Sequence, residues 1–227
     1  MSVSHPLDRP IWASLTTRQA GLALGDDRAR RFQPDYGVFA AAVDRSADSR
    51  TALRELLAAY GEAALVEAEE PDVPDGVTVA SRAICWQMIA EAPKIVAADF
   101  EVAALTDADA AEMLALATLT RPGPFFARTH QLGDFVGVKR GGRLIAMAGE
   151  RMKPAGFTEV SGVCVHPDHR GHGYAAGLMS LVAGAILARG EIPFLHVYDH
   201  NKPAIAIYDA LGYRLRREMV MLMVGAA

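Results

Sequence analysis

The sequence predicts an α/β protein in which a central sheet is flanked by helices. The second half of the chain alternates strand-like and helix-like segments, an order that is typical of this class. Apolar residues make up 51% of the 227 residues, which is enough to bury a sizeable core. The chain is long for one average domain and short for two. We therefore expect two connected α/β parts.

The composition excludes several classes of protein. The net charge is −4, with acidic and basic residues interspersed, so we do not expect a nucleic-acid binder. Charges, prolines or glycines interrupt every apolar run before it reaches membrane-spanning length, so we expect no membrane partner. The N-terminus, MSVSHPLDRPIW, lacks the features of a secretory signal. Cys85 and Cys164 lie in apolar runs without metal-ligand spacing, which favours reduced thiols and a cytoplasmic protein.

The first part, residues 1–94, carries no chemical motif and is expected to be an accessory α/β segment that ends near Glu91-Ala92-Pro93-Lys94. Ser49 can cap a helix that continues to Ala59, because Leu53, Leu56 and Leu57 lie on one face. An Arg-, Asp- and Pro-rich loop precedes this helix. The other predicted elements are strands at Ile11–Leu15, Ala20–Leu24, Ala63–Ala68 and Val77–Ile89.

The second part, residues 95–227, is more regular. Thr106 is predicted to cap a helix that runs to about Leu119, with Asp107 and Asp109 in its first turn. Strands on either side of Gly141-Gly142 predict a hairpin. The strands predicted here are Phe100–Leu105, Phe135–Lys139, Arg143–Glu150, Thr158–His166, Pro193–Tyr198 and Arg216–Val224; the further helices are Phe125–Gln131, Ala175–Ala188 and Pro203–Leu211.

Residues 165–176, VHPDHRGHGYAA, lie between a predicted strand and a predicted helix and allow three interpretations. A metal site would use His166, His169 and His172, but a spacing of three aligns ligands only on a helix, and this stretch is a loop. A dinucleotide site would use G-x-G-x-x-A with Glu191 as the ribose ligand. Glu191 precedes the next strand instead of ending it, and too little chain follows for a doubly wound domain.

The third interpretation is a phosphate cradle. The first amides of a helix are unpaired and carry partial positive charge, so they attract an anion. Gly171 and Gly173 allow close backbone approach, and Arg170 adds a cation suited to phosphate. The loop can therefore hold a phosphate or pyrophosphate without a metal.

Arg170-Gly171-His172-Gly173-Tyr174-Ala175 resembles the Q/R-x-x-G-x-G/A motif of the GNAT superfamily of N-acetyltransferases. The preceding strand, VSGVCVHPDHRG, resembles the fourth strand of that family. HVYDHNKPAIAIYDALGY resembles its next strand and its N-x-x-A-x-x-x-Y helix. The resemblance covers about residues 99–224, is greatest to the FR47-like branch, and implies a mixed, partly splayed central sheet flanked by helices.

The resemblance implies acetyl-CoA as co-substrate, with no metal. The motif would bind the pyrophosphate, and backbone amides of the fourth strand would face the pantetheine and polarise the thioester. Tyr208 would be the general acid near the sulfur, and Asn201 would bind the cofactor arm beside the small Ala204. Alternatively, Asn201 is only a helix cap and Tyr208 a packing residue. The residues expected to bind the co-substrate are Val163, Cys164, Val165, Arg170, Gly171, His172, Gly173, Tyr174, Ala175, Asn201, Ala204 and Tyr208.

The general base is left open between three candidates. Glu159 begins the fourth strand, where several family members place a carboxylate, but it can equally be a solvated charge. His196 in the neighbouring strand is the second candidate, and ordered water is the third. Cys164 as an acyl-carrying nucleophile is disfavoured, because transfer in this family is usually direct.

The resulting expectation is an acyltransferase that moves an acetyl group from the thioester to a primary amine of a small molecule or peptide by direct attack. The alternative is a non-catalytic acyl-CoA-binding or regulatory module. The sequence leaves open whether the protein forms a homodimer, and it does not specify the acceptor amine. Residues 1–94 are expected to be a degenerate or accessory half that shapes the acceptor cleft or an interface.

Overall fold

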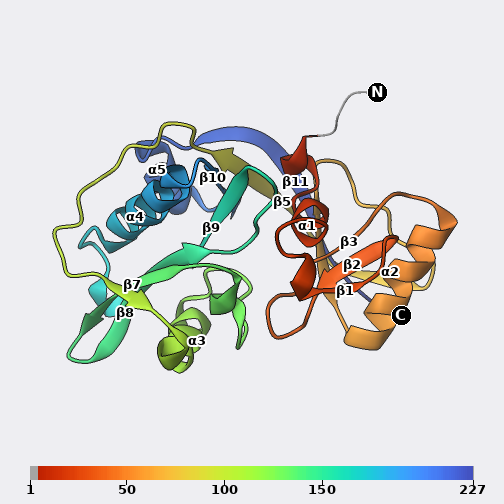
Figure 1. Ribbon diagram of the computed structural model, residues 1–227, viewed down its shortest axis with the longest axis horizontal. Coiled ribbons are helices and arrows are strands. Elements are labelled where there is room, and N and C mark those ends of the chain that lie inside the picture. The colour runs from red at the N-terminus through yellow and green to blue at the C-terminus, as the bar shows by residue number, and fades with distance from the viewer. Residues whose placement is uncertain (1–4, 227) are drawn as a thin grey trace.

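The computed structural model describes residues 5–226, which form one large mixed sheet and one small sheet (Figure 1). The large sheet has the strand order β4-β11-β5-β10-β9-β8-β7-β6, and all neighbours are antiparallel except β9 and β10. The predicted α/β fold with a mixed central sheet is therefore confirmed. The strands are β4 (Ala63–Glu67), β5 (Val77–Ile89), β6 (Ala103–Leu105), β7 (Phe135–Arg140), β8 (Arg143–Glu150), β9 (Phe157–Val165), β10 (Ile192–Tyr198) and β11 (Arg214–Ala226).

Helices cover the large sheet, and some of them begin at residues whose side chains cap the first amides. The main helices are α2 (Ala47–Tyr60), α3 (Ala110–Thr120), α4 (Tyr174–Ala188) and α5 (Lys202–Ala210). Ser46 caps α2, three residues before the predicted Ser49. Thr106 and Asp109 form a capping box that opens the 3₁₀ turn η3 (Asp107–Asp109) and leads into α3. Leu178, Met179 and Ile186 of α4 are fully buried in the core that Leu195 of β10 and Tyr213 share.

The N-terminal part differs from the prediction at three places, one of which is the predicted Ala20–Leu24 strand, where Ala20–Leu22 is a 3₁₀ turn. Ile11–Leu15 is not a strand but belongs to helix α1 (Pro10–Leu15), in which Ile11, Ser14 and Leu15 share the buried face. Proline at the first helical position favours this start, and a short apolar run does not separate helix from strand. The predicted loop contains two further strands. The small sheet consists of β1 (Ala23–Gly25), β2 (Ala29–Phe32) and β3 (Ala40–Ala42), preceded by the 3₁₀ turns η1 (Pro6–Asp8) and η2 (Ala20–Leu22).

Two predicted elements of the second part are shorter than expected. Only Ala103–Leu105 of the predicted Phe100–Leu105 strand pairs with β7. The helix predicted at Phe125–Gln131 is reduced to the 3₁₀ turn η4 (Thr129–Leu132). A further 3₁₀ turn, η5 (Pro167–His169), lies in the glycine-containing loop.

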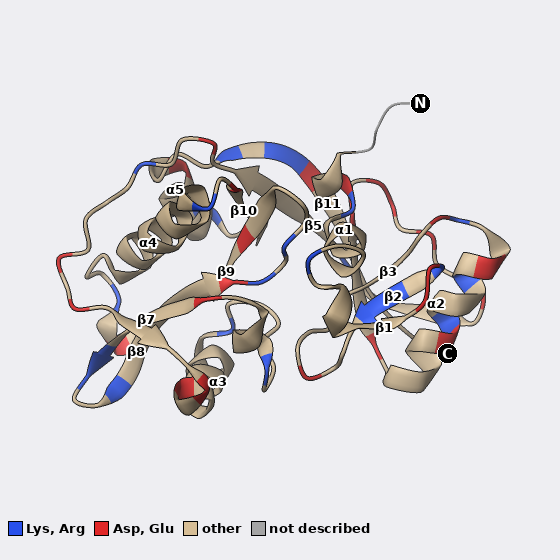
Figure 2. Ribbon diagram, in the orientation of Figure 1, with Lys and Arg blue, Asp and Glu red and all other residues tan. Residues whose placement is uncertain are grey.

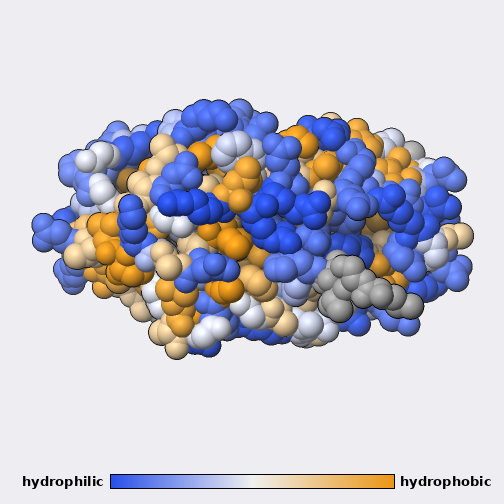
Figure 3. Space-filling view, turned by 90° about the horizontal axis from the view of Figure 1, so that it is seen from above, coloured by the Kyte–Doolittle hydropathy of each residue, from blue (hydrophilic) through white to orange (hydrophobic). Residues whose placement is uncertain are grey.

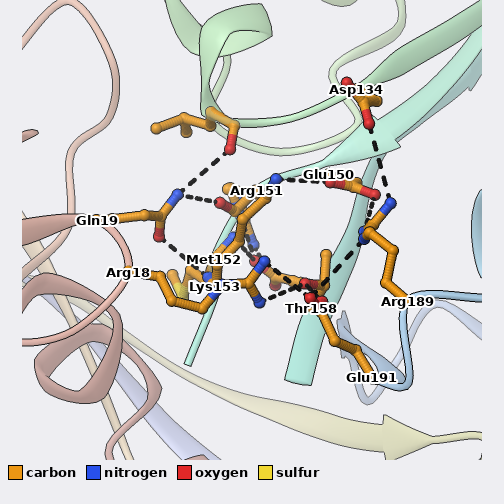
Figure 4. Close-up of polar contacts among 12 residues, drawn as sticks. Arg18, Gln19, Asp134, Glu150, Arg151, Met152, Lys153, Thr158, Arg189 and Glu191 are labelled. Carbon is orange, nitrogen blue, oxygen red and sulfur yellow. Dashed lines mark hydrogen bonds and ion pairs between the residues drawn. The ribbon is translucent and has the colours of Figure 1, made fainter. Parts of the chain in front are cut away.

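The two parts of the chain are joined through one sheet. β5, from residues 1–94, lies between β10 and β11 and pairs with β11 over almost its whole length. Figure 4 shows a second connection, in which Gln19 donates to the carbonyl of Arg151 at 2.7 Å and accepts from the amide of Lys153 at 3.0 Å. Arg18 also forms an ion pair with Glu191 at 2.9 Å. These contacts bind the N-terminal part to the connection between β8 and β9 and to the residue that precedes β10.

The surface carries charges of both signs. Figure 2 shows basic and acidic residues interspersed over both parts of the ribbon. In the face seen in Figure 3, hydrophobic residues gather in small groups between hydrophilic ones. No helix among residues 5–226 has the length and hydropathy needed to cross a bilayer.

Candidate active site

The site begins where β9 and β10 separate. These parallel strands pair only from Ile192 opposite Phe157 to Phe194 opposite Glu159. Beyond these residues β9 remains paired with β8, and β10 remains paired with β5. The edge of β9 that faces β10 is therefore left without a partner strand, and an extended ligand can use its backbone groups.

The loop before α4 has the geometry of an anion cradle. Gly171 and Gly173 adopt φ values of 81° and 75°, in the left-handed region that glycine tolerates best. Gly173 is the N-cap of α4, so the first amides of this helix point toward the loop without intrahelical acceptors. Arg170 is exposed beside them. His172 is held by its own loop, because its Nδ1 lies 2.9 Å from the carbonyl oxygen of Arg170.

A groove of about 890 Å³ connects this loop with β9 and α5. Every residue predicted to bind the co-substrate lines it, from Val163–Val165 through Arg170–Ala175 to Asn201, Ala204 and Tyr208. The segment Thr120–Pro124 also lines the groove. Because the loop and α5 lie at the carboxyl ends of β9 and β10, the fold brings both motifs to one opening. The roles of these residues toward a ligand stay predictions.

Tyr208 and Asn201 lie on the same face of α5. Burial raises the pKa of Tyr208 to about 12, so its hydroxyl is protonated and able to donate at neutral pH. Asn201 is the N-cap of α5, and its Oδ1 accepts from the amide of Ala204 at 3.4 Å. The capping role thus leaves the side-chain amide NH₂ of Asn201 available at the groove.

A smaller cavity of about 100 Å³ adjoins the groove. Pro122–Pro124, Val163, Tyr198, Asn201 and Tyr208 line both spaces, so the two spaces meet beside the Tyr208 ring. Phe39, Val66 and Cys85 of the first part also line this cavity. Strand periodicity alone could not have shown that these apolar residues face a cavity in the second part of the chain.

Glu159 lies beneath the cavity and does not line it or the groove. Its carboxylate is fully buried and accepts from Arg151 Nε at 2.8 Å, Arg151 Nη2 at 2.7 Å and the amide of Met152 at 3.3 Å. Burial alone would raise the pKa of Glu159, but the Arg151 guanidinium and the hydrogen bond from His196 lower it to about 2. An ionised carboxylate with both oxygens occupied cannot readily take a proton from a substrate directly.

His196 lines the small cavity and is held between two side chains. Its Nδ1 lies 2.7 Å from Glu159 Oε1, and its Nε2 lies 3.1 Å from Nε2 of the fully buried Gln87. Gln87 Nε2 also donates to the carbonyl of Leu7, and its Oε1 accepts from Arg216, so the amide orientation is determined. We therefore assign the proton to Nδ1 of a neutral His196, with Nε2 as acceptor.

The two cysteines are buried and free. Burial raises the pKa of both the Cys85 and the Cys164 thiol to about 11, so each remains a protonated thiol at neutral pH. Cys164 therefore lacks the thiolate that an acyl-carrying nucleophile needs. Among residues 5–226, no three His, Cys, Asp or Glu side chains are arranged to hold a metal ion.

The Glu159–Arg151 pair gives a prediction on stability. We expect Glu159→Gln to lower the free energy of unfolding by about 3–5 kcal/mol at neutral pH, because Arg151 would remain buried without its partner. The folded pKa of Glu159, about 2, lies below the ordinary value of 4.5, so its stabilising contribution is lost as the pH falls from 4.5 toward 2. The difference in free energy of unfolding between the variant and the wild type, measured by urea unfolding, should therefore shrink over that pH range.

The control for this variant is Asp168→Asn, which neutralises an exposed carboxylate whose side chain is 84% exposed. It should unfold at the same urea concentration as wild type. A Glu159→Gln protein as stable as this control at neutral pH would contradict the assigned ion pair.

Comparisons with known proteins agree with this geometry. The family model described as FR47-like protein matches residues 135–222. A search of curated proteins finds no match. A crystal structure of a protein assigned to the GNAT family, from Novosphingobium aromaticivorans DSM 12444, is 44% identical, covers 99% of this chain and 100% of its own, and has a TM-score of 0.91.

Two more distant structures share the fold. A GCN5-related N-acetyltransferase from Kribbella flavida is 20% identical, with coverages of 96% and 95% and a TM-score of 0.64. A GCN5-related N-acetyltransferase-like protein from Streptococcus suis 89/1591 is 16% identical, with coverages of 96% and 92% and a TM-score of 0.59. The full-length similarity to the Novosphingobium protein, together with the FR47-like match, shows that the chain belongs to the GNAT family of acetyltransferases.

Proposed function

We propose that this protein is an acetyl-CoA-dependent N-acetyltransferase that transfers the acetyl group directly to an amine. The observation that carries the proposal is the continuous path from the loop at Arg170–Gly173, along the unpaired edge of β9, to Tyr208 and the small cavity. A phosphate-bearing thioester fits the wide groove, and an amine fits the small cavity. The two substrates would meet where the spaces join.

The residues of the groove match the parts of such a co-substrate. The amides at the start of α4 and the Arg170 guanidinium supply donors for a pyrophosphate. The backbone of Val163–Val165, beyond the last β9–β10 pair, supplies donors for an extended pantetheine arm and for the thioester oxygen. Acetyl-CoA would supply an activated acyl group with a thiolate as leaving group.

We assign Tyr208 the role of general acid. When the amine nitrogen bonds to the carbonyl carbon, the carbon–sulfur bond breaks, and the Tyr208 hydroxyl donates its proton to the departing thiolate. The amine nitrogen releases one proton to water in the open groove, and Tyr208 regains a proton from water. Glu159, with both oxygens occupied, acts as a positioning residue for Arg151 and His196.

Tyr208→Phe tests this assignment. We expect kcat to fall about 100-fold or more while the Kd for acetyl-CoA changes little, because only the proton donor is lost. Thiol release with a panel of amines and longer acyl-CoAs measures turnover, and calorimetry measures binding.

Tyr213→Phe is the matched control. The Tyr213 ring centroid lies 6.3 Å from that of Tyr208. The Tyr213 hydroxyl is buried without a hydrogen-bond partner among residues 5–226, and Tyr213 is not among the described residues that line the groove or the cavity. This variant should keep the wild-type kcat. An equal loss of kcat in both variants would show that the effect of Tyr208→Phe is structural. If the wild-type protein binds acetyl-CoA but shows no turnover, it is a non-catalytic acyl-CoA-binding module.

We further propose that residues 1–94 are an accessory part that shapes the acceptor cavity. Phe39, Val66 and Cys85 in its wall, and Gln87 behind His196, support this role.

A further inference from the structure

The small cavity is lined by apolar side chains, among them Phe39, Val66 and Met221, and also by polar ones, among them Ser161, His196 and Asn201. Its described lining contains no aspartate or glutamate, and neither does that of the adjoining groove. The charged side chains that line the two spaces are Arg121, Arg151 and Arg170. A substrate with several ammonium groups would therefore find arginine side chains and no aspartate or glutamate in the lining to pair with, which is unfavourable.

Arg151 supplies a charged, directional group to the cavity lining. Its Nε and Nη2 are held by Glu159, and its guanidinium carbon lies 4.6 Å from the centroid of the Phe39 ring. Within residues 5–226, Nη1 has no hydrogen-bond partner, and the side chain keeps 11% of its surface exposed. Arginine pairs with carboxylates through such planar N–H groups.

The volume of the small cavity suits a small group. A cavity of about 150 Å³ holds one benzene ring, so about 100 Å³ accommodates roughly four or five non-hydrogen atoms. A carboxylate, its α-carbon and a methyl group together have this size. The amine would then lie at the junction with the groove, beside Tyr208.

We propose that the acceptor is a free α-amino acid with a small apolar side chain, whose carboxylate binds Nη1 of Arg151. The apolar wall of Phe39, Val66 and Met221 holds the side chain. Because no carboxylate lines the cavity to stabilise an ammonium, the amine reacts as the neutral nucleophile. This inference rests on the proposed N-acetyltransferase reaction and specifies its second substrate.

An acceptor panel with the wild-type protein and acetyl-CoA tests the inference. The panel contains alanine, alaninamide, ethylamine, phenylalanine, the dipeptide alanylglycine and spermidine, with thiol release as the readout. We expect kcat/KM for alanine to exceed that for ethylamine and alaninamide by about 30-fold or more, because both lack the carboxylate. Phenylalanine, alanylglycine and spermidine should also be poor acceptors.

The outcomes separate this inference from the proposed function. Ethylamine, spermidine or alanylglycine accepted as well as alanine would overturn the amino-acid acceptor while leaving N-acetyl transfer in place. Thiol release with no amine of the panel, or of the wider amine panel above, would overturn the proposed function itself.

Arg151→Lys gives an independent readout, with Arg189→Lys as matched control. Arg189 also pairs with a buried carboxylate, that of Glu150 at 2.5 Å, but lines neither the cavity nor the groove. We expect Arg151→Lys to lower kcat/KM for alanine about 10-fold or more relative to kcat/KM for ethylamine measured with the same variant, because only alanine carries the carboxylate that the guanidinium binds. Equal losses with alanine and ethylamine, or the same relative loss in Arg189→Lys, would overturn the role of Arg151.

Discussion

A chain shortened to residues 97–227 is expected to be insoluble or unfolded, with no measurable acetyl transfer. It retains the glycine loop, β9, α4 and α5, but it loses β5, which lies between β10 and β11. Both strands would then expose unpaired edges, and the core would lose the fully buried Met88. Expression yield, circular dichroism and thiol release measure the effect.

A chain of residues 5–227 is the control, because it keeps every described element. It should fold and react like the full chain. Adding a separately expressed chain of residues 1–96 should make part of the 97–227 protein soluble again, because β5 could then pair with β10 and β11 from a separate chain. A 97–227 chain that folds and acetylates normally would disprove the accessory role of residues 1–94.

Gly173→Glu is expected to abolish acetyl-CoA binding, with Kd rising about 100-fold or more. The new carboxylate would lie among the free amides at the start of α4 and repel a pyrophosphate. The φ of 75° adds a strain of about 1–2 kcal/mol for a residue with a side chain. Calorimetry with acetyl-CoA measures the loss of binding.

Gly142→Glu reproduces the backbone strain away from the groove. Gly142 has a φ of 76° in the β7–β8 turn, and no atom within 4 Å would contact an added Cβ at either glycine. The two variants should therefore lose similar stability, whereas only Gly173→Glu should lose binding. If Gly173→Glu binds acetyl-CoA like Gly142→Glu, the loop is not the pyrophosphate site.

Features that depend on neighbouring residues were predictable. The start of α4 at Gly173 and Tyr174 follows from glycines before a helical apolar pattern, and the shared face of Asn201, Ala204 and Tyr208 follows from helical spacing. The α/β class and the β7–β8 hairpin were predicted for the same reason. The strand predicted at Ile11–Leu15 was wrong because so short and mostly apolar a run fits either a helix or a strand until its packing partners are known.

The sequence by itself determined the loop at Arg170–Gly173, the helix that carries Tyr208 and the family to which these motifs point, because backbone conformation and helical spacing are local properties. Only the tertiary structure decided what surrounds them. Gln87 and His196 meet across 109 positions, and Arg151 and Phe39 come together from different parts of the chain. Strand order determines these neighbours, and alternation along a strand shows which residues share a face but not what that face contacts.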